Sequence, residues 1–192
     1  FVEIACEFGV HMRIENGIKS CLQTWVGHNS FLASFCPVEY RTDFAPEVLL
    51  VMALTGTNPD RFAEEQERGL TIDLGFASTS LPSGRTVAII DVPGHVRFLK
   101  NMLAGVGAVD ACLFVVDANE GWKPQTEEHL RILELLGVGH GVIALTKVGI
   151  ADEDLVELAR LDVAEHVEGT FLEDAPVIGV DSIDGTGIDD LR

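Results

Sequence analysis

The stretch IIDVPGHVRFLKNMLAG, residues 89–105, decides the fold, because it places reactive residue types directly after an apolar run. Asp91 ends that run, and Pro93, Gly94 and His95 follow within four residues. Proline fixes a turn, glycine lets a backbone N–H approach a ligand closely, and histidine can orient a water molecule. A single carboxylate such as that of Asp91 can hold a magnesium ion through a water. Taken alone, this short motif fits a plain strand-to-helix turn equally well.

The chain from residue 71 onward alternates strand patterns with helix patterns. The segments TIDLGFASTSL (71–81) and TVAIID (86–91) flank turn residues and predict a hairpin. Helix patterns then separate three further apolar runs, which are ACLFVVD, GVIALT and PVIGV. Short apolar runs between amphipathic helices are typical of strands buried on both faces. The sequence therefore predicts an α/β fold with a mostly parallel sheet flanked by helices.

Ligands of such sheets bind beyond the carboxyl ends of the strands, so the functional residues should directly follow the apolar runs. That rule predicts one edge that carries Asp91, Asp117, Thr146 with Lys147, and Asp181 with Ser182. Other patterns have structural explanations. Leu130, Leu133 and Leu136 stand at helical spacing and predict core positions, and the acid-rich helix after Asp152 predicts a solvated outer face.

Composition excludes several classes of function. The formal net charge of −18 argues against a broad grip on RNA, DNA or anionic lipid, so no direct DNA binding is expected. The four cysteines lie far apart without a CxxC pair and predict reduced thiols in a cytoplasmic protein. No apolar run reaches the length of a membrane span, and the N-terminus has acids where a signal peptide needs bases.

Several motifs in order carry a resemblance to a known family. ERGLTIDLGF, DVPGHVRFLKNMLAG, GWKPQTEEHL and ALTK follow one another at ordinary loop lengths. With them the chain resembles the P-loop GTP-binding domain of translational GTPases, from about Leu50 to Arg192. The segments RGLTIDLGF and DVPGHVRFLKNMLAG are most similar to those of the selenocysteine-specific elongation factors. Elongation factor Tu is similar in layout but differs after the Thr-Ile pair and at Phe98.

The resemblance implies GTP and Mg²⁺ as ligands and assigns roles at the terminal-phosphate end. Thr71 matches the switch threonine that meets magnesium and the γ-phosphate, and Asp91 matches the magnesium-linked aspartate. Pro93 and Gly94 match the turn that offers a backbone N–H to the γ-phosphate. His95 matches the catalytic histidine that positions the hydrolytic water.

At the base end, the resemblance assigns guanine recognition to Thr146, Lys147 and the backbone N–H of Ser182. One residue departs from the family pattern: Gly149 stands where the family has an aspartate that accepts two hydrogen bonds from guanine. Hydrogen bonds to a charged group contribute about 1.5–3 kcal/mol each, so this loss weakens the preference for guanine.

A larger departure concerns the phosphate-binding loop. The lysine of that loop should fall at Glu47, its preceding glycine at Pro46, and the Ser or Thr that binds magnesium at Val48 or Leu49. The apolar first strand is also missing, since FLASFCPVEY is broken by a proline and ends in charge. Either a frame disturbance or wrong start replaced residues 1–49, which we favour, or the chain is a natural nucleotide-blind relative.

The domain organisation follows from these departures. Residues 1–49 have no assignable fold, and residues 50–192 form a GTPase-like domain that is truncated at its C-terminus. The chain opens on Phe1 and closes on GTGIDDLR, the first turn of a helix that does not continue and has no packing face, so we expect a fragment.

Two classes of function remain open. The first is a GTP-hydrolysing domain of a translation elongation factor, with selenocysteinyl-tRNA and the ribosome as partners of the full-length protein and nucleotide binding impaired in this chain. The second is a nucleotide-blind interaction module of the same fold. Another translational GTPase of the elongation factor Tu type is a further alternative.

Overall fold

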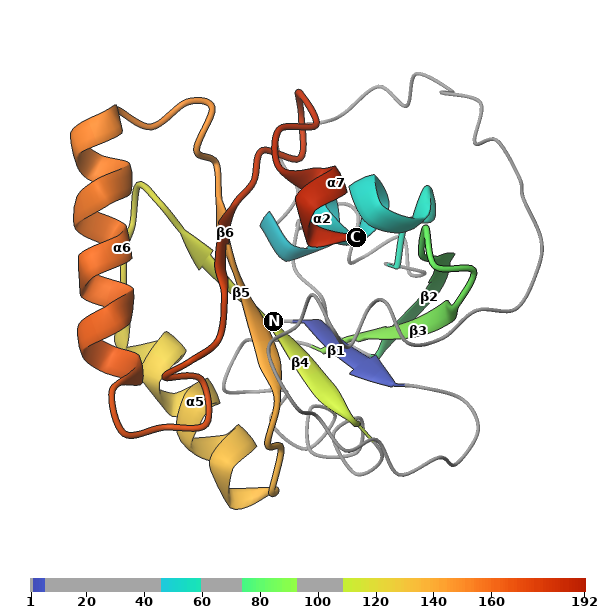
Figure 1. Cartoon of the computed structure of the whole chain (residues 1–192), viewed down its shortest axis with the longest axis horizontal. Coiled ribbons are helices and arrows are strands. Elements are labelled where there is room, and N and C mark those ends of the chain that lie inside the picture. The colour runs from blue at the N-terminus through green and yellow to red at the C-terminus, as the bar shows by residue number, and fades with distance from the viewer. Residues whose placement is uncertain (1, 6–45, 60–73, 93–108) are drawn as a thin grey trace.

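The computed structural model describes residues 2–5, 46–59, 74–92 and 109–192 of the chain. One six-stranded sheet has the order β2-β3-β1-β4-β5-β6 (Figure 1). Its strands are β1 (Val2–Ala5), β2 (Gly75–Ser80), β3 (Thr86–Asp91), β4 (Ala111–Asp117), β5 (Gly141–Thr146) and β6 (Val177–Gly179). The helices are α2 (Pro46–Thr55), α5 (Pro124–Leu135), α6 (Glu153–Val167) and α7 (Ile188–Leu191).

The strand directions confirm the predicted α/β fold. Strands β4, β5 and β6 pair in parallel, and β2 pairs antiparallel with β3 in the predicted hairpin. The hairpin turn closes where the N–H of Leu81 donates to the carbonyl of Arg85 at 2.7 Å. Since β1 is antiparallel to both β3 and β4, those two strands run in the same direction. The first residues of the predicted segment TIDLGFASTSL, 71–73, lie outside the described residues.

The N-terminal residues contribute a strand and the start of a helix that the sequence did not predict. The sequence offered no fold for residues 1–49, yet Val2–Ala5 form β1 between β3 and β4, and α2 begins at Pro46. A strand is needed there, because otherwise the facing edges of β3 and β4 would leave backbone N–H and C=O groups without partners. Four extended residues satisfy those groups whatever their direction. The segment FLASFCPVEY lies outside the described residues.

Helices cover both faces of the sheet, because successive side chains of a strand point to opposite sides. On one face, α5 and α6 pack against Phe114 and Val116 of β4 and Ile143 of β5. On the other face, α2 and α7 pack against Leu113 and Ala144, the alternate residues of the same strands. The result is a three-layer domain with two cores (Figure 1).

The bounds of α5 agree with local sequence signals. Pro124 is the first residue of α5, and Gly137, just beyond its end, has a φ of 78°. Within that helix Leu130 and Leu133 are fully buried as predicted. The prediction for Leu136 is wrong: it lies past the last helical residue and is 43% exposed. The predicted helix after Asp91 lies outside the described residues.

The C-terminal turn α7 has a packing face, contrary to expectation. Ile188 is buried in the same core as Leu50 and Leu54 of α2. The guanidinium of Arg192 donates to the carbonyls of Ala53 at 3.4 Å and Leu54 at 3.0 Å, which are at the end of α2. These contacts hold a helix of one turn that could not persist by itself.

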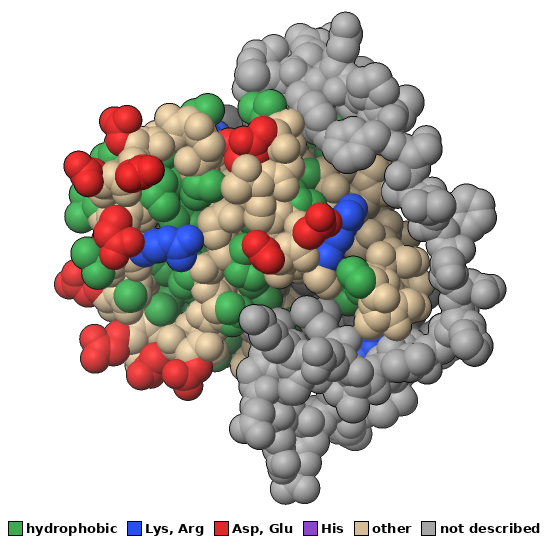
Figure 2. All heavy atoms as spheres, turned by 45° about the horizontal axis from the view of Figure 1, so that its top comes forward, with side chains coloured by type: hydrophobic (Ala, Val, Ile, Leu, Met, Phe, Trp, Pro, Cys, Tyr) green, Lys and Arg blue, Asp and Glu red, His purple; other side chains and the backbone are tan. Residues whose placement is uncertain are grey.

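The surface agrees with the predicted solvated helix. In α6 only Ala159, Val163 and Val167 are buried. Acidic and hydrophobic side chains both lie on the part of the surface that carries this helix (Figure 2, left), and Leu155, Leu158 and Leu161 are among its exposed residues. Within the described ranges, no helix is both long and apolar enough to cross a membrane.

Two leucines of α5 provide a matched test of the core. Leu133→Ala should lower the free energy of unfolding by about 2–5 kcal/mol, because the side chain is fully buried. Leu135→Ala, at an 86% exposed position of the same helix, should change it by less than about 0.5 kcal/mol. Urea denaturation followed by circular dichroism measures both. Equal losses would contradict the described face of α5.

Candidate functional site

Buried polar side chains gather at the carboxyl ends of the parallel strands. Six polar or charged side chains are buried among the described residues, and all but Arg85 belong to this edge. These five are Asp91, Asp117, Thr146, Asp181 and Ser182. Burying such groups costs free energy unless they bind something, so their concentration at one edge indicates a site.

Asp91 is fully buried at the end of β3. Its backbone lies between Val2 of β1 and Gly75 of β2. A Cβ on Gly75 would lie 2.7 Å from the Cβ of Pro59 and 3.1 Å from that of Asp91, so only glycine fits beside this aspartate. The other residues predicted for the terminal-phosphate end, Thr71, Pro93, Gly94 and His95, lie outside the described residues.

An ion pair joins the ends of β4 and β5. The ammonium of Lys147 lies 2.5 Å from Oδ2 of Asp117, whose side chain is 8% exposed. The backbone N–H of Asn119 donates to the other carboxylate oxygen at 2.8 Å. Lys147 has a φ of 62°, an uncommon backbone conformation for a side chain of this size. The sequence pattern placed Asp117 at this edge but gave it no role, because a single aspartate after a strand carries no signal of its partner.

Two neighbouring loops form the predicted base end, after β5 and after β6. The backbone N–H of Gly149 donates to Oδ2 of Asp181 at 3.2 Å, and that of Val148 donates to the carbonyl of Val180 at 3.4 Å. Oδ1 of Asp181 accepts from the N–H of Ile183 at 2.8 Å. These bonds hold the loop that follows Thr146 and Lys147 against the loop that contains Ser182.

A second carboxylate lies in the same loop. The hydroxyl and then the backbone N–H of Thr186 hold the pKa of Asp184 below its usual value. The backbone bond, from the Thr186 N–H to Oδ1 of Asp184, is 2.8 Å long. Asp184 is exposed, whereas Asp181 is buried, so the base end holds two carboxylates in different surroundings.

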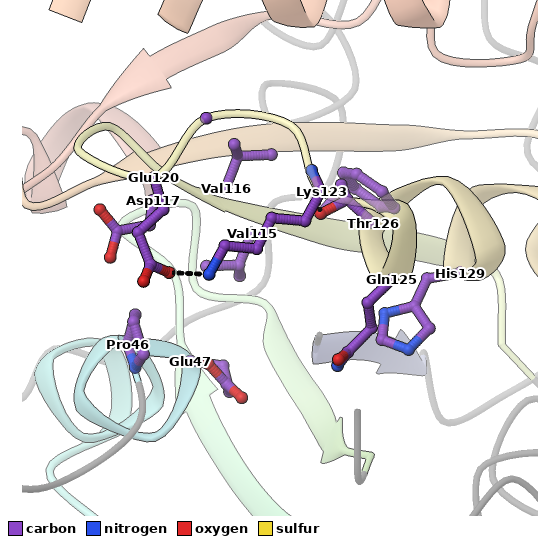
Figure 3. Close-up of a pocket in the computed structure, with 12 residues that line it drawn as sticks. Pro46, Glu47, Val115, Val116, Asp117, Glu120, Lys123, Gln125, Thr126 and His129 are labelled. Carbon is purple, nitrogen blue, oxygen red and sulfur yellow. Dashed lines mark hydrogen bonds and ion pairs between the residues drawn. The ribbon is translucent and has the colours of Figure 1, made fainter. Parts of the chain in front are cut away.

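A cavity of about 190 Å³ separates the start of α2 from the end of β4 and the start of α5. Pro46 and Glu47 lie on one side, opposite the side chains of Glu120 and Lys123, which form an ion pair of 2.5 Å (Figure 3). Asp117 also lines the cavity. Its lining holds three carboxylates and one lysine, and Glu47 is the carboxylate that takes no part in the ion pairs of Glu120 with Lys123 and of Asp117 with Lys147.

The sequence from residue 44 to residue 192 matches the family of the elongation factor Tu GTP binding domain. The chain belongs to this family. The match covers α2 and every later described element, and it begins six residues before the boundary near Leu50 at which the sequence motifs start.

Within this family, the chain is similar to several selenocysteine-specific elongation factors. The chain is 49% identical over 143 residues to a selenocysteine-specific elongation factor of Desulfomicrobium baculatum, covering 74% of this chain and 23% of that protein. The crystal structure of a bacterial selenocysteine-specific elongation factor EF-Sec superposes with a TM-score of 0.71 and 41% identity, over 75% of this chain and 25% of that one. The elongation factor SelB of Methanococcus maripaludis, solved with the GTP analogue GPPNHP, superposes with a TM-score of 0.63 and 26% identity. That superposition covers 74% of this chain and 28% of the SelB chain. The chain thus spans about a quarter of the length of these relatives.

The ion pair at the edge can be tested against a matched exposed pair. A double-mutant cycle of Asp117→Asn and Lys147→Met should give a coupling of about 1–2 kcal/mol, between the values of surface and buried pairs. The same cycle on Glu120 and Lys123 should give less than about 0.5 kcal/mol, because both side chains are about half exposed. Urea denaturation of the seven proteins, the shared parent and three variants for each pair, measures both couplings. Equal couplings would contradict a stronger ion pair between Asp117 and Lys147.

Proposed function

We propose that this chain is the GTP-binding and GTP-hydrolysing domain of a translation elongation factor that delivers selenocysteinyl-tRNA to the ribosome. The observation that carries the proposal is the 49% identity to a selenocysteine-specific elongation factor over three quarters of the chain. The polar edge of the sheet supports it, because that edge holds Asp91, Lys147 and Ser182 at the ends of three different strands. Their roles are those implied by the family resemblance.

In this proposal the terminal-phosphate end would perform the chemistry. His95 would orient a water for in-line attack, and Gly94, after the turn at Pro93, would donate its N–H to the γ-phosphate. A hydrolysing GTPase needs Mg²⁺ to neutralise charge on the phosphates. Of the positions expected to hold that ion, Asp91 fits, and Thr71 lies outside the described residues. Val48 and Leu49 do not fit, because they have no side-chain oxygen and are buried in the core.

Nucleotide binding by this chain is impaired in our proposal, because the start of α2 opposes a triphosphate. A helix N-terminus normally attracts phosphate through its free N–H groups and its dipole. Here Pro46 lacks an N–H, and the carboxylate of Glu47 already supplies a negative charge to the first turn. The acidic lining of the adjoining cavity adds to the repulsion.

A nucleotide-blind interaction module of the same fold is the alternative that these features favour. The two proposals differ in the origin of residues 1–49. Sequencing the gene across its start distinguishes them: an intact Gly-Lys-Ser/Thr loop in another frame supports the GTPase, and a true open frame supports the module. In either case we place the protein in the cytoplasm, with RNA contacts made outside this acidic chain.

Titration with a fluorescent GTP analogue in magnesium buffer tests the impairment. The chain should bind the GTP analogue with a dissociation constant well above about 1 μM. Pro46→Gly with Glu47→Lys should tighten binding, because it restores an N–H donor and reverses the charge. Glu157→Lys, the same charge change on the exposed face of α6, should not. Micromolar or tighter binding by the parent chain would refute the impairment.

A second prediction concerns hydrolysis by a chain whose phosphate loop has been restored. There His95→Ala should slow GTP hydrolysis by about 100-fold or more while leaving GTP affinity nearly unchanged. The reason is that a water-positioning group acts on the transition state and not on the bound ground state. Single-turnover hydrolysis and equilibrium binding measure the two quantities. A loss of affinity with an unchanged hydrolysis rate would assign His95 to binding instead.

A further inference from the structure

Asp181 lies beside the one position of the base end that departs from the family pattern. Its side chain is 4% exposed, and its Oδ2 lies 3.2 Å from the backbone nitrogen of Gly149. The family resemblance expects an aspartate at position 149, whose carboxylate would read the guanine edge. The lost carboxylate and the buried one are therefore neighbours.

The geometry relates the two positions closely. A Cβ built on Gly149 would lie 2.7 Å from Oδ2 of Asp181 and 3.1 Å from its Cγ. Within an aspartate, the bond lengths put each carboxylate oxygen about 2.4 Å from the Cβ. The distance from this Cβ position to Oδ2 of Asp181, 2.7 Å, is therefore close to the distance of about 2.4 Å that an aspartate at position 149 would have to its own carboxylate oxygens.

The backbone does not explain the glycine. Gly149 is not among the glycines with positive φ, so its conformation admits a side chain. What excludes a side chain is the carboxylate of Asp181, because real Cβ atoms do not approach other atoms to 2.7 Å. A side chain at position 149 therefore requires the Asp181 carboxylate to move away from its hydrogen bonds with the N–H groups of Gly149 and Ile183.

We propose that the base-reading carboxylate of this chain has moved from position 149 to Asp181, and that Asp181 selects guanine over adenine. This inference rests on the proposed function in that the base end receives a purine. On the relevant edge guanine presents the ring N1–H donor, whereas adenine presents a ring acceptor, so one free acceptor position is enough to distinguish the two purines. A carboxylate accepts at about four positions, and Asp181 uses three, for the N–H groups of Gly149, Ile183 and Asp184. The fourth is on Oδ2, the oxygen nearest Gly149.

Asp184 is the rival carboxylate and provides the matched control. Its Oδ2 lies 3.1 Å from the Cβ position of Gly149, but the side chain is exposed. Water competes for hydrogen bonds at an exposed group, so Asp184 should discriminate less between purines. Asp184→Asn removes the same charge from the same loop as Asp181→Asn.

Ligand-detected NMR with guanosine, inosine and adenosine at millimolar concentration tests the assignment on the full chain. Nucleosides have no phosphates, so the readout does not depend on the phosphate loop. The parent chain should bind guanosine and inosine, which both carry the N1–H donor, more tightly than adenosine. Asp181→Asn, which keeps an oxygen for the turn, should lower the guanosine-to-adenosine ratio about tenfold or more, and Asp184→Asn should not. No preference in the parent, or a preference that survives Asp181→Asn, overturns the proposal.

A stability measurement tests the exclusion without any ligand. Gly149→Ala should lower the urea midpoint of the parent chain clearly and that of the Asp181→Ala chain much less, because the second lacks the clashing carboxylate. Equal shifts in the two backgrounds would overturn the exclusion. Tight GTP binding in the earlier titration would refute the impaired phosphate end and leave both of these readouts unaffected.

Discussion

The continuity of the sheet depends on four residues. Strands β3 and β4 run in the same direction, and β1 lies between them and pairs with both. All pairing between the β2–β3 hairpin and the parallel strands β4 to β6 passes through Val2–Ala5 within the described chain. The position of Asp91 relative to Asp117, and hence the geometry of the polar edge, is set by the width of that one strand. Packing of α2 across Val87, Ile89 and Leu113 supports the same junction from one face.

At the polar edge, the free-energy cost of burying charged side chains is offset by ion pairs and hydrogen bonds within the chain. After β4 and after β6 a buried carboxylate is paired by a lysine or a backbone N–H of a neighbouring loop. Asp117 is paired in this way by Lys147, and Asp181 by the N–H of Gly149. A charge is likewise paired within the chain at the start of α2. There Glu47 supplies the negative charge that an anionic ligand would otherwise bring to the helix N-terminus. Features that stabilise the chain without a ligand therefore compete with the ligand.

The sequence predicted the parts of this structure that repeat a local rule. Apolar runs predicted β3 to β6 and their common direction, and the helical spacing of Leu130 and Leu133 predicted the buried face of α5. It failed for β1, because four residues carry no period and the demand for a strand comes from β3 and β4, more than 80 residues later. It also failed for α7, because Ile188 packs against α2, a helix that is distant in the sequence. At the site, the motifs gave the residue types at each strand end, but the pairing of Asp181 with position 149 depends on two loops that meet only in the fold.

The packing of α7 on α2 has a consequence for how the domain is made. Arg192 donates to the carbonyl of Leu54 across 138 positions of sequence, and β1 must wait for β3 and β4 before it can pair. Contacts of such separation slow folding, because a long stretch of chain has to be ordered before they form. During synthesis the apolar residues of α2 therefore lack the cover of Ile188 until α7 has emerged from the ribosome. The core on this face of the sheet is complete only when α7 packs on α2.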